Sequence, residues 1–408
     1  MMSGRDICGI AQTGTGKTIA YLLPCLRLWS FTKEKNPTIL ILVPTRELVV
    51  QVVEEVKRLT SYMSFRVVGV YGGVNMRPQA DAVAEGCDMV VGTPGRLMDL
   101  VYQGTLKLKG IKKFILDEAD EMLNLGFRPQ IFQIMEVLPQ KRQNLLFSAT
   151  LSPDVESILD VYFNTPQRIE AAPAGTPLEG ISQSYYKVPN FYTKVNLLES
   201  LLGFDKTMNK VLVFISTRRK ADVLHELINE RFQEQIGVIH SNKDQKTRFN
   251  SVRKFDDGSF RVLIATDIIA RGIDLAGVSH VVNFDIPDEV EAYIHRIGRT
   301  GRADQKGIAI SFVTEKEQPL FDAIQEYMKY EVPEVEIPEE VEISTELTND
   351  EKPKGNLKEI YIKLPTFKEM SGAFHQKLEK NKKVNVKVRH SDKMMAKYGK
   401  PQKRKPRK

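Results

Sequence analysis

Short apolar runs alternate with longer amphipathic stretches along the first part of this 408-residue chain. The runs are brief, rich in aliphatic and β-branched residues, and closed by turn residues, which is typical of strands buried in a parallel sheet. The intervening stretches, such as 16–29 and 46–60, have the periodicity of helices. This alternation predicts a doubly wound α/β domain. Its six predicted strands lie within residues 6–11, 38–44, 66–71, 88–94, 113–120 and 144–150.

The alternation then starts again, which predicts a second domain of the same α/β class. Residues 172–180, rich in Pro, Gly and Ala, separate the two series and are typical of a linker. We therefore expect one domain over 1–171 and another over 181–330. The strands of the second series are predicted within residues 181–189, 210–217, 236–241, 261–267, 279–285 and 307–314.

The net charge of +7 is unevenly distributed. Residues 331–351 contain nine carboxylates and no Lys or Arg, whereas 352–408 contain 19 Lys and Arg against four carboxylates. We expect an acidic hinge over 331–351 and a basic, largely disordered tail over 352–408 that favours a polyanionic partner. Part of the acidic run is also compatible with a last strand of the second domain.

Three cysteines and the N-terminal residues bear on the cellular compartment. Cys8, Cys25 and Cys87 have neither CxxC nor metal-ligand spacing, which is typical of buried thiols in a reducing environment. The first ten residues lack the apolar segment of a signal peptide, and the longest apolar runs are strand-sized. We expect a cytoplasmic protein without membrane contact.

The segment AQTGTGKT, residues 11–18, has the character of a phosphate-binding loop. It follows a predicted strand and opens a predicted helix, so its backbone N–H groups would face an anion at the helix N-terminus. Gly14 and Gly16 allow close backbone approach, Lys17 reaches the β- and γ-phosphates, and Thr18 is a ligand suited to Mg²⁺. Ala11 stands where the general loop has a glycine.

Two carboxylates end the strand in LDEAD, residues 116–120. Asp117 suits a Mg²⁺ ion held through water, and Glu118 suits polarisation of an attacking water. The hydroxyls of SAT, residues 148–150, follow another strand and could relay between a nucleotide site and a second domain.

The second domain carries HRIGRTGR, residues 295–302, with three arginines at a spacing of three in a Gly-rich turn. A nucleotide site in the first domain needs compensation of transition-state charge, and an arginine finger supplies ~10³–10⁵-fold in rate. This pattern predicts a site shared by the two domains.

The order of these segments resembles that of the DEAD-box RNA helicases. The resemblance covers residues 5 to 330 and rests on AQTGTGKT, PTREL, GG, TPGR, DEAD, SAT, VFIST, ATDIIARGID and HRIGRTGR. The tail and the overall pattern are most similar to the bacterial RhlE-type subgroup. The resemblance implies two RecA-like domains and an RNA-stimulated ATPase that unwinds short duplexes, with ATP, Mg²⁺ and RNA as its ligands.

The resemblance also implies a role for individual residues. Catalysis would involve Lys17, Asp117, Glu118, Arg299 and Arg302. ATP would be bound by Ala11, Gln12, Thr13, Gly14, Thr15, Gly16, Lys17, Thr18 and Asp274, and Mg²⁺ would be held by Thr18 and, through water, Asp117. Ser148 and Thr150 would couple the domains. The RNA backbone would be bound, without sequence selection, by Pro44, Thr45, Arg46, Gly73, Thr93, Pro94, Gly95, Arg96, Thr217, Gln245, Arg248, Thr266 and Asp267.

One family element is not visible in this sequence. DEAD-box proteins have an adenine-binding glutamine and an upstream aromatic residue ahead of the phosphate loop, and the ten residues before Ala11 contain no Gln. A misassigned start, a chosen boundary or a true loss would each explain this. We expect the 408-residue chain to bind ATP weakly and to tolerate GTP, since its loop contacts only phosphates.

Two other functions remain compatible with these patterns. An RNA clamp or chaperone with weak ATPase activity would follow from a missing adenine segment, and ATP turnover with and without RNA distinguishes it. A DNA translocase would share the tandem domains, but the DEAD and HRIGRTGR motifs favour RNA.

Overall fold

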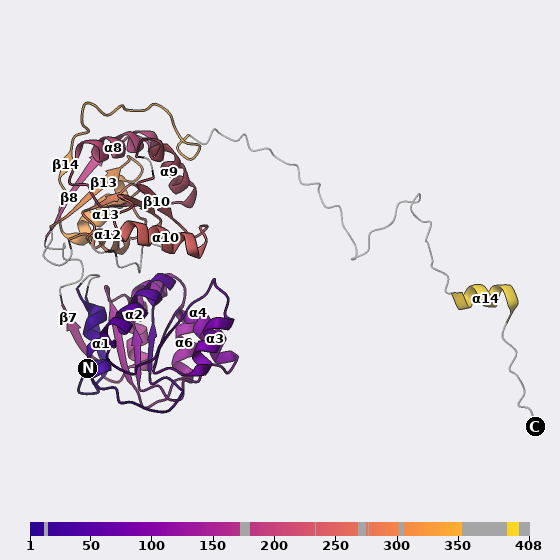
Figure 1. The fold of residues 1–408 in the computed structure, drawn as a ribbon. Coiled ribbons are helices and arrows are strands. Elements are labelled where there is room, and N and C mark those ends of the chain that lie inside the picture. The colour runs from indigo at the N-terminus through magenta and orange to yellow at the C-terminus, as the bar shows by residue number, and fades with distance from the viewer. Residues whose placement is uncertain are drawn as a thin grey trace, which may run out of the picture. The chain divides into compact units, whose positions relative to one another are not determined.

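The computed structural model describes residues 1–11, 15–171, 180–232, 234–267, 275, 277–301, 306–352 and 390–399 (Figure 1). Residues 1–352 form one compact unit. Within it lie two seven-stranded sheets, one on each side of the predicted linker. Of that linker, 172–179 lie outside the described residues.

Every strand pair in the first sheet is parallel, in the order β3-β4-β2-β5-β6-β1-β7. Its strands are β1 (Ile7–Ile10), β2 (Ile39–Leu42), β3 (Val67–Val70), β4 (Met89–Gly92), β5 (Lys113–Leu116), β6 (Gln143–Ser148) and β7 (Gln167–Glu170). The helices of this domain are α1 (Lys17–Arg27), α2 (Arg46–Leu59), α3 (Arg77–Glu85), α4 (Pro94–Tyr102), α5 (Ala119–Asn124), α6 (Arg128–Val137) and α7 (Pro153–Tyr162).

The second sheet repeats this topology strand for strand, in the order β10-β11-β9-β12-β13-β8-β14. Its strands are β8 (Ile181–Lys187), β9 (Val211–Phe214), β10 (Ile236–Ile239), β11 (Val262–Ala265), β12 (His280–Asn283), β13 (Gly307–Val313) and β14 (Glu334–Val335). Its helices include α8 (Phe191–Phe204), α9 (Arg218–Phe232), α10 (Gln245–Asp256), α12 (Val290–Ile297) and α13 (Gln318–Met328). The predicted tandem of parallel α/β domains is confirmed.

Alternate residues of the central strands face opposite helical layers, as the two-residue period of a strand requires. In β2, Leu40 and Leu42 pack in one core cluster, and Ile39 and Ile41 pack in another. The first cluster includes residues of α4, α6 and α7, and the second includes residues of α1 and α2. The central strands of this sheet are therefore buried on both faces.

Residues 331–351 lie against the second domain for most of their length, although their composition predicts a hinge. Strand β14 pairs in parallel with β8. Val332 and Val341 are buried in the cores of this domain, where they join the residues of α13 and α8 respectively. These apolar side chains, spaced among the carboxylates, explain why the segment packs instead of extending into solvent.

The unit after Lys352 contains one described helix, α14 (His390–Tyr398). It lies in the part of the chain for which composition predicts disorder, so the helix is a departure from that expectation. No helix among the described residues combines the length and apolar character that crossing a bilayer demands.

Candidate nucleotide and RNA site

The phosphate loop leads into α1 through a glycine in the left-handed region. Gly16 has φ 81° and caps the helix, a conformation that costs a glycine little. The next residue, Lys17, has a buried Nζ with no hydrogen-bond partner among the described residues. A buried ammonium without a hydrogen-bond acceptor is costly, even with carboxylates nearby, so this position favours an additional acceptor such as a phosphate oxygen. The predicted contacts Gln12, Thr13 and Gly14 lie outside the described residues.

Asp117 follows β5 and is held by two hydrogen bonds. Its Oδ2 accepts from the hydroxyl of Tyr21 at 2.8 Å, and its Oδ1 accepts from the backbone N–H of Glu118 at 3.0 Å. Burial raises the pKa of Asp117, while Lys17 and the Tyr21 hydroxyl act in the opposite direction. Tyr21 lies one helical turn after Lys17 on α1 and was not among the predicted site residues.

Glu118 adopts a backbone conformation that is rare for a residue with a side chain. Its φ of 52° and ψ of 52° lie in the left-handed region, which costs ~1–3 kcal/mol and is found mainly at functional sites. Burial raises the pKa of Glu118, and the charges of Arg299 and Lys17 lower it. A carboxylate with a raised pKa is better suited to accept a proton near neutral pH.

A small cavity brings together three of the predicted catalytic residues. Its lining includes Lys17 from the phosphate loop, Glu118 from the LDEAD segment and Arg299 from the second domain. His295 also lines it, although it was not assigned a role from the sequence. The predicted contacts Arg302 and Asp274 lie outside the described residues.

Asp120 connects the LDEAD segment to SAT. Its Oδ2 accepts hydrogen bonds from the backbone N–H of Ala149 at 3.1 Å and from both the N–H and the hydroxyl of Thr150 at 2.9 Å. The hydroxyl of Ser148 accepts from the N–H of Asp120 at 3.3 Å. Ser148 and Thr150 were predicted to couple the domains, whereas Asp120, which contacts both of them, was not predicted.

His295 lies 3.9 Å from the same oxygen of Asp120, measured from its Nε2. Burial alone would raise the pKa of Asp120, but His295, Lys17 and the hydroxyls of Thr150 and Ser148 hold it below its usual value. The first letter of HRIGRTGR was the available signal for this histidine. The contact joins the SAT network of the first domain to α12 of the second.

Four helix N-termini carry most of the residues predicted to bind RNA. Helices α2, α4, α9 and α10 each begin shortly after the end of a parallel strand, namely β2, β4, β9 and β10. Backbone N–H groups at such ends, together with the helix dipole, favour phosphate groups. The predicted residues found there are Pro44, Thr45, Arg46, Thr93, Pro94, Gly95, Arg96, Thr217, Gln245 and Arg248.

The ends of α2 and α10 contact each other across the two domains. Arg46 donates to Oε1 of Gln245 at 3.1 Å, and Gln245 donates in turn to Oε1 of Glu47 at 3.1 Å. Glu47 also forms a buried ion pair with Arg248. Three of these four residues were predicted to bind RNA, and Glu47 was missed although it follows Arg46 in PTREL.

Gly73 provides the space for the Arg46 side chain. Its φ is +74°, and a Cβ atom at this position would overlap the Arg46 guanidinium. Arg96 is held in the same domain by bonds to Oε1 of Gln79 at 3.3 Å and to the carbonyl of Val74 at 3.1 Å. These contacts orient two of the predicted RNA-binding arginines.

Asp267 in the second domain is engaged by Arg296. The guanidinium donates to both carboxylate oxygens, at 2.6 and 2.7 Å, and also to the carbonyl of Asp285 at 2.7 Å. Asp267 was predicted to bind RNA, and in this structure both of its carboxylate oxygens accept hydrogen bonds from Arg296 within the domain. Its neighbour Thr266 is buried, with its N–H 3.4 Å from the carbonyl of Ile239.

Each of the two domains matches a known protein family. Residues 1–158 match the DEAD/DEAH box helicase family, and residues 193–304 match the helicase conserved C-terminal domain. Among solved structures, the chain is similar to S. cerevisiae Dbp5 bound to RNA and ADP BeF3, with 31% identity and a TM-score of 0.74. That similarity covers 82% of this chain and 86% of the other.

Curated relatives extend the similarity to nearly the whole chain. A DEAD-box ATP-dependent RNA helicase CshA of Bacillus cereus is 39% identical over 391 residues, which are 94% of this chain and 72% of that protein. The CshA of Geobacillus kaustophilus is 40% identical over 316 residues, covering 78% of this chain and 67% of that protein. From this similarity and the geometry of its site, the chain belongs to the DEAD-box family of ATP-dependent RNA helicases.

Proposed function

We propose that this ATP-dependent RNA helicase separates short RNA duplexes by hydrolysing ATP between its two domains. The observation that supports this is the shared cavity, where Lys17 and Glu118 of the first domain meet Arg299 of the second. Neither domain supplies all three groups, so hydrolysis would depend on how the domains meet. This dependence favours an ATP-driven helicase over a passive RNA clamp.

A Mg²⁺ ion fits the residues around the phosphate loop. Thr18 and Asp117 offer the oxygen donors that Mg²⁺ prefers. In our proposal, Asp117 binds the ion through water. The buried Nζ of Lys17, which has no hydrogen-bond acceptor among the described residues, supports a triphosphate at this place. When bound, the ion would neutralise part of the negative charge of the phosphates.

Hydrolysis requires a proton acceptor and a counter-charge. Glu118 would take the proton from the attacking water, since burial raises the pKa of its carboxylate. Arg299 would offset the charge that develops on the transferred phosphoryl group. ATP and water would thereby give ADP and phosphate.

RNA binding would be linked to this chemistry through two interdomain contacts. Arg46 and Glu47 of α2 meet Gln245 and Arg248 of α10 at the predicted RNA face. The Asp120 carboxylate meets His295 near the nucleotide cavity. A strand bound across both domains would favour their closed arrangement and with it the complete catalytic cavity.

Substitution of Arg299 tests the composite site. Arg299→Ala should reduce RNA-stimulated ATP hydrolysis by ~10³-fold or more, with a much smaller loss of nucleotide affinity. Arg299→Lys keeps the positive charge and controls for loss of charge alone, since lysine cannot reproduce the planar fork. Equal turnover in Arg299→Ala and the unaltered protein would contradict the proposed function of the cavity.

Three finer assignments remain proposals. The curated relatives named above are CshA proteins, which give no support to the RhlE-type subgroup, so we propose a CshA-like role. A cytoplasmic location is compatible with Cys8, Cys25 and Cys87, all buried and free. RNA would be bound through its backbone without sequence selection.

A further inference from the structure

Residues 336–352, which we call the C-terminal strap, are fastened to the start of α8. Val341 anchors the strap in the hydrophobic core of the second domain. Ser344 is bound on both sides: its carbonyl accepts from Nδ2 of Asn190 at 2.6 Å, and its N–H donates to the hydroxyl of Thr193 at 3.0 Å. The strap therefore has a defined path over this part of the domain.

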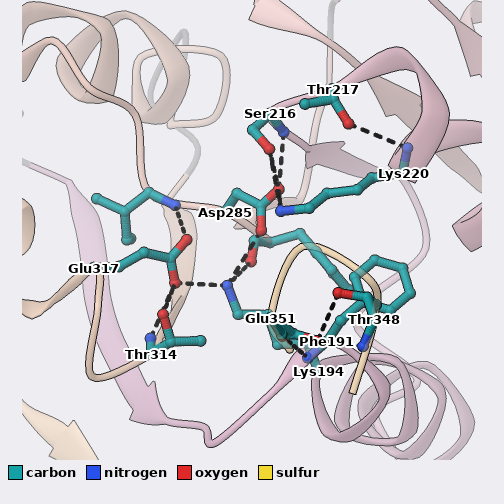
Figure 2. A network of polar contacts seen from close by, with 12 residues as sticks. Phe191, Lys194, Ser216, Thr217, Lys220, Asp285, Thr314, Glu317, Thr348 and Glu351 are labelled. Carbon is teal, nitrogen blue, oxygen red and sulfur yellow. Dashed lines mark hydrogen bonds and ion pairs between the residues drawn. The ribbon is translucent and has the colours of Figure 1, made fainter. Parts of the chain in front are cut away.

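Glu351 fixes the far end of the strap. One of its carboxylate oxygens accepts from the backbone N–H of Phe191, the first residue of α8, at 2.7 Å. The other accepts from the N–H and the hydroxyl of Thr348, at 2.9 and 2.8 Å (Figure 2). A carboxylate at a helix N-terminus is favoured by the helix dipole, which adds to this attachment.

A groove of about 530 Å³ lies between the strap and the starts of α8 and α9. This volume is within the range typical of small-molecule sites. Thr217, one of the predicted RNA-binding residues, lies on its wall. The groove is therefore continuous with the proposed RNA face of the second domain.

The groove wall that carries Thr217 is held in place by hydrogen bonds to the buried carboxylate of Asp285. Oδ2 of Asp285 accepts from the N–H of Ser216 at 3.0 Å, from its hydroxyl at 2.6 Å and from Nζ of Lys220 at 3.1 Å (Figure 2). Lys194, which is itself buried, lies 3.3 Å from the other oxygen. This network makes the groove a preformed feature of the fold.

The groove offers the three kinds of group that a nucleotide needs. Tyr192 supplies an aromatic ring for stacking a base. Arg219 is exposed, has no hydrogen bond or ion pair within the described part of the chain, and supplies a cation for a phosphate. Glu346 and Asp350 of the strap supply acceptors for the amino groups on base edges.

We propose that this groove binds a nucleotide of single-stranded RNA that extends beyond the strand held across the two domains. The proposal rests on the RNA-binding function proposed above and adds a base-stacking site to its backbone contacts. The base would stack on Tyr192 with its phosphate near Arg219, and the strap would close the other side. A longer single strand would then bind more tightly than a short one.

The test compares two single strands, of about six and about twelve nucleotides, in the full chain with a non-hydrolysable ATP analogue. Tyr192→Ala should weaken binding of the longer strand by about tenfold, as expected for one stacked base, and Arg219→Ala should weaken it by removing the cation near the phosphate. Both variants should bind the shorter strand as the unaltered protein does. Replacing the extra nucleotides by abasic ones should remove the part of the gain that Tyr192→Ala removes, because the phosphates remain but no base can stack.

Arg231→Ala is the matched control, because Arg231 lies at the other end of α9 and pairs with Glu199 at 3.3 Å. It should leave both affinities unchanged. Full retention of the length-dependent gain in Tyr192→Ala and Arg219→Ala would overturn the proposal and leave a peptide as the fitting occupant. Equal weakening of both strands would also overturn it, by placing these residues in the main RNA site.

Photo-crosslinking locates the bound base independently of affinity. A 4-thiouridine in the extension should crosslink to Tyr192 or to the strap, whereas crosslinks confined to the first domain would contradict the groove. An unaltered protein that binds neither strand would contradict the proposed function itself, and this result is distinct from loss of the length-dependent gain alone.

Discussion

The hydroxyl of Tyr21 donates a hydrogen bond of 2.8 Å to the Oδ2 atom of Asp117, and both side chains are buried. The bond connects α1, which begins at the phosphate loop, to the carboxylate at the end of β5. It lowers the pKa of Asp117 and opposes the effect of burial. A tyrosine in the core of the first domain therefore helps to keep this carboxylate ionised and oriented.

Tyr21→Phe removes this bond while keeping the ring in its place beside Phe147, 5.3 Å away between centroids. Hydrogen bonds to charged groups contribute ~1.5–3 kcal/mol, so nucleotide affinity at limiting Mg²⁺ should fall by about tenfold. Because the pKa of Asp117 should rise, the acid limb of the ATPase pH profile should move to higher pH. Titration of a fluorescent ADP against Mg²⁺ measures the first effect.

Tyr293→Phe is the control for Tyr21→Phe. Tyr293 is also fully buried, and its hydroxyl lies 3.0 Å from Oε1 of Gln183 in the second domain, away from the phosphate loop. The control should alter stability without moving the Mg²⁺ dependence. An unchanged Mg²⁺ dependence in Tyr21→Phe would mean that the hydroxyl is not needed to position Asp117.

Glu118→Gln should strongly slow hydrolysis and stabilise the nucleotide-free protein. Burial raises the pKa of Glu118, so above its unfolded pKa the folded state binds more protons than the unfolded state. Stability from this group therefore falls as pH rises through that window, and at neutral pH the buried charge is destabilising. Glutamine removes the charge, while loss of the base costs ~10²–10⁴-fold in rate.

Thermal unfolding of Glu118→Gln at several pH values measures this effect. The variant should have the higher Tm at neutral pH, and its advantage should shrink as pH falls toward the unfolded pKa of a glutamate. Glu121→Gln, which replaces another buried carboxylate of the same segment, is the variant with which Glu118→Gln is compared. A Tm advantage that is constant with pH would show that the charge of Glu118 is not its cause.

Gly73→Ala tests how the first domain presents Arg46. An added Cβ would overlap the guanidinium, and alanine is also strained at a φ of +74°. The displaced arginine should lose its bond to Gln245, and RNA affinity should fall by about tenfold. Gly72→Ala is the control, because a Cβ there comes only to 4.0 Å of the Arg46 side chain. Equal affinities of the two variants would exclude this role of Gly73.

Most of the sheet could be predicted because strands buried on both faces are continuous apolar runs. Strand β7 was missed, since its four residues, QRIE, are all exposed and lack such a run. The strap was assigned to a hinge because carboxylates dominate it, although Val341 is buried. Composition averages over a segment, whereas one apolar residue at the right position is enough to anchor it.

The residues of the candidate site likewise fall into those that the sequence predicts and those that it does not. Lys17, Glu118 and Arg299 stand in motifs whose residue types directly indicate their chemistry. Tyr21 could have been inferred from the helical period, because residues four apart share a face of α1. Asp120 and Glu47 act through partners distant in sequence, and a single sequence does not show which strand ends meet.

The basic tail provides a test that is separate from the groove. Removal of residues 353–408 retains Lys352 and the strap but takes away most of the positive charge of the tail. If the tail binds RNA phosphates, the log–log salt dependence of RNA binding should become shallower by ~0.7 for each phosphate that the shortened chain no longer neutralises. Identical slopes for the two chains would assign the tail a role other than RNA binding.

Thr150→Val should separate ATP hydrolysis from duplex unwinding. The substitution keeps the shape of the side chain but removes the hydroxyl that donates to Oδ2 of Asp120 at 2.9 Å. The backbone N–H of Thr150 still donates to the same oxygen, so the first domain should remain folded.

Asp120 would be held less firmly beside His295, the contact that reaches the second domain. We expect strand separation to fall by about tenfold or more, because a hydrogen bond to a carboxylate contributes ~1.5–3 kcal/mol. RNA-stimulated ATP turnover should stay within about twofold. Thr150→Ser retains the hydroxyl and should behave as the unaltered protein. A parallel loss of both activities in Thr150→Val would show that this hydroxyl supports catalysis and not the coupling of the two domains.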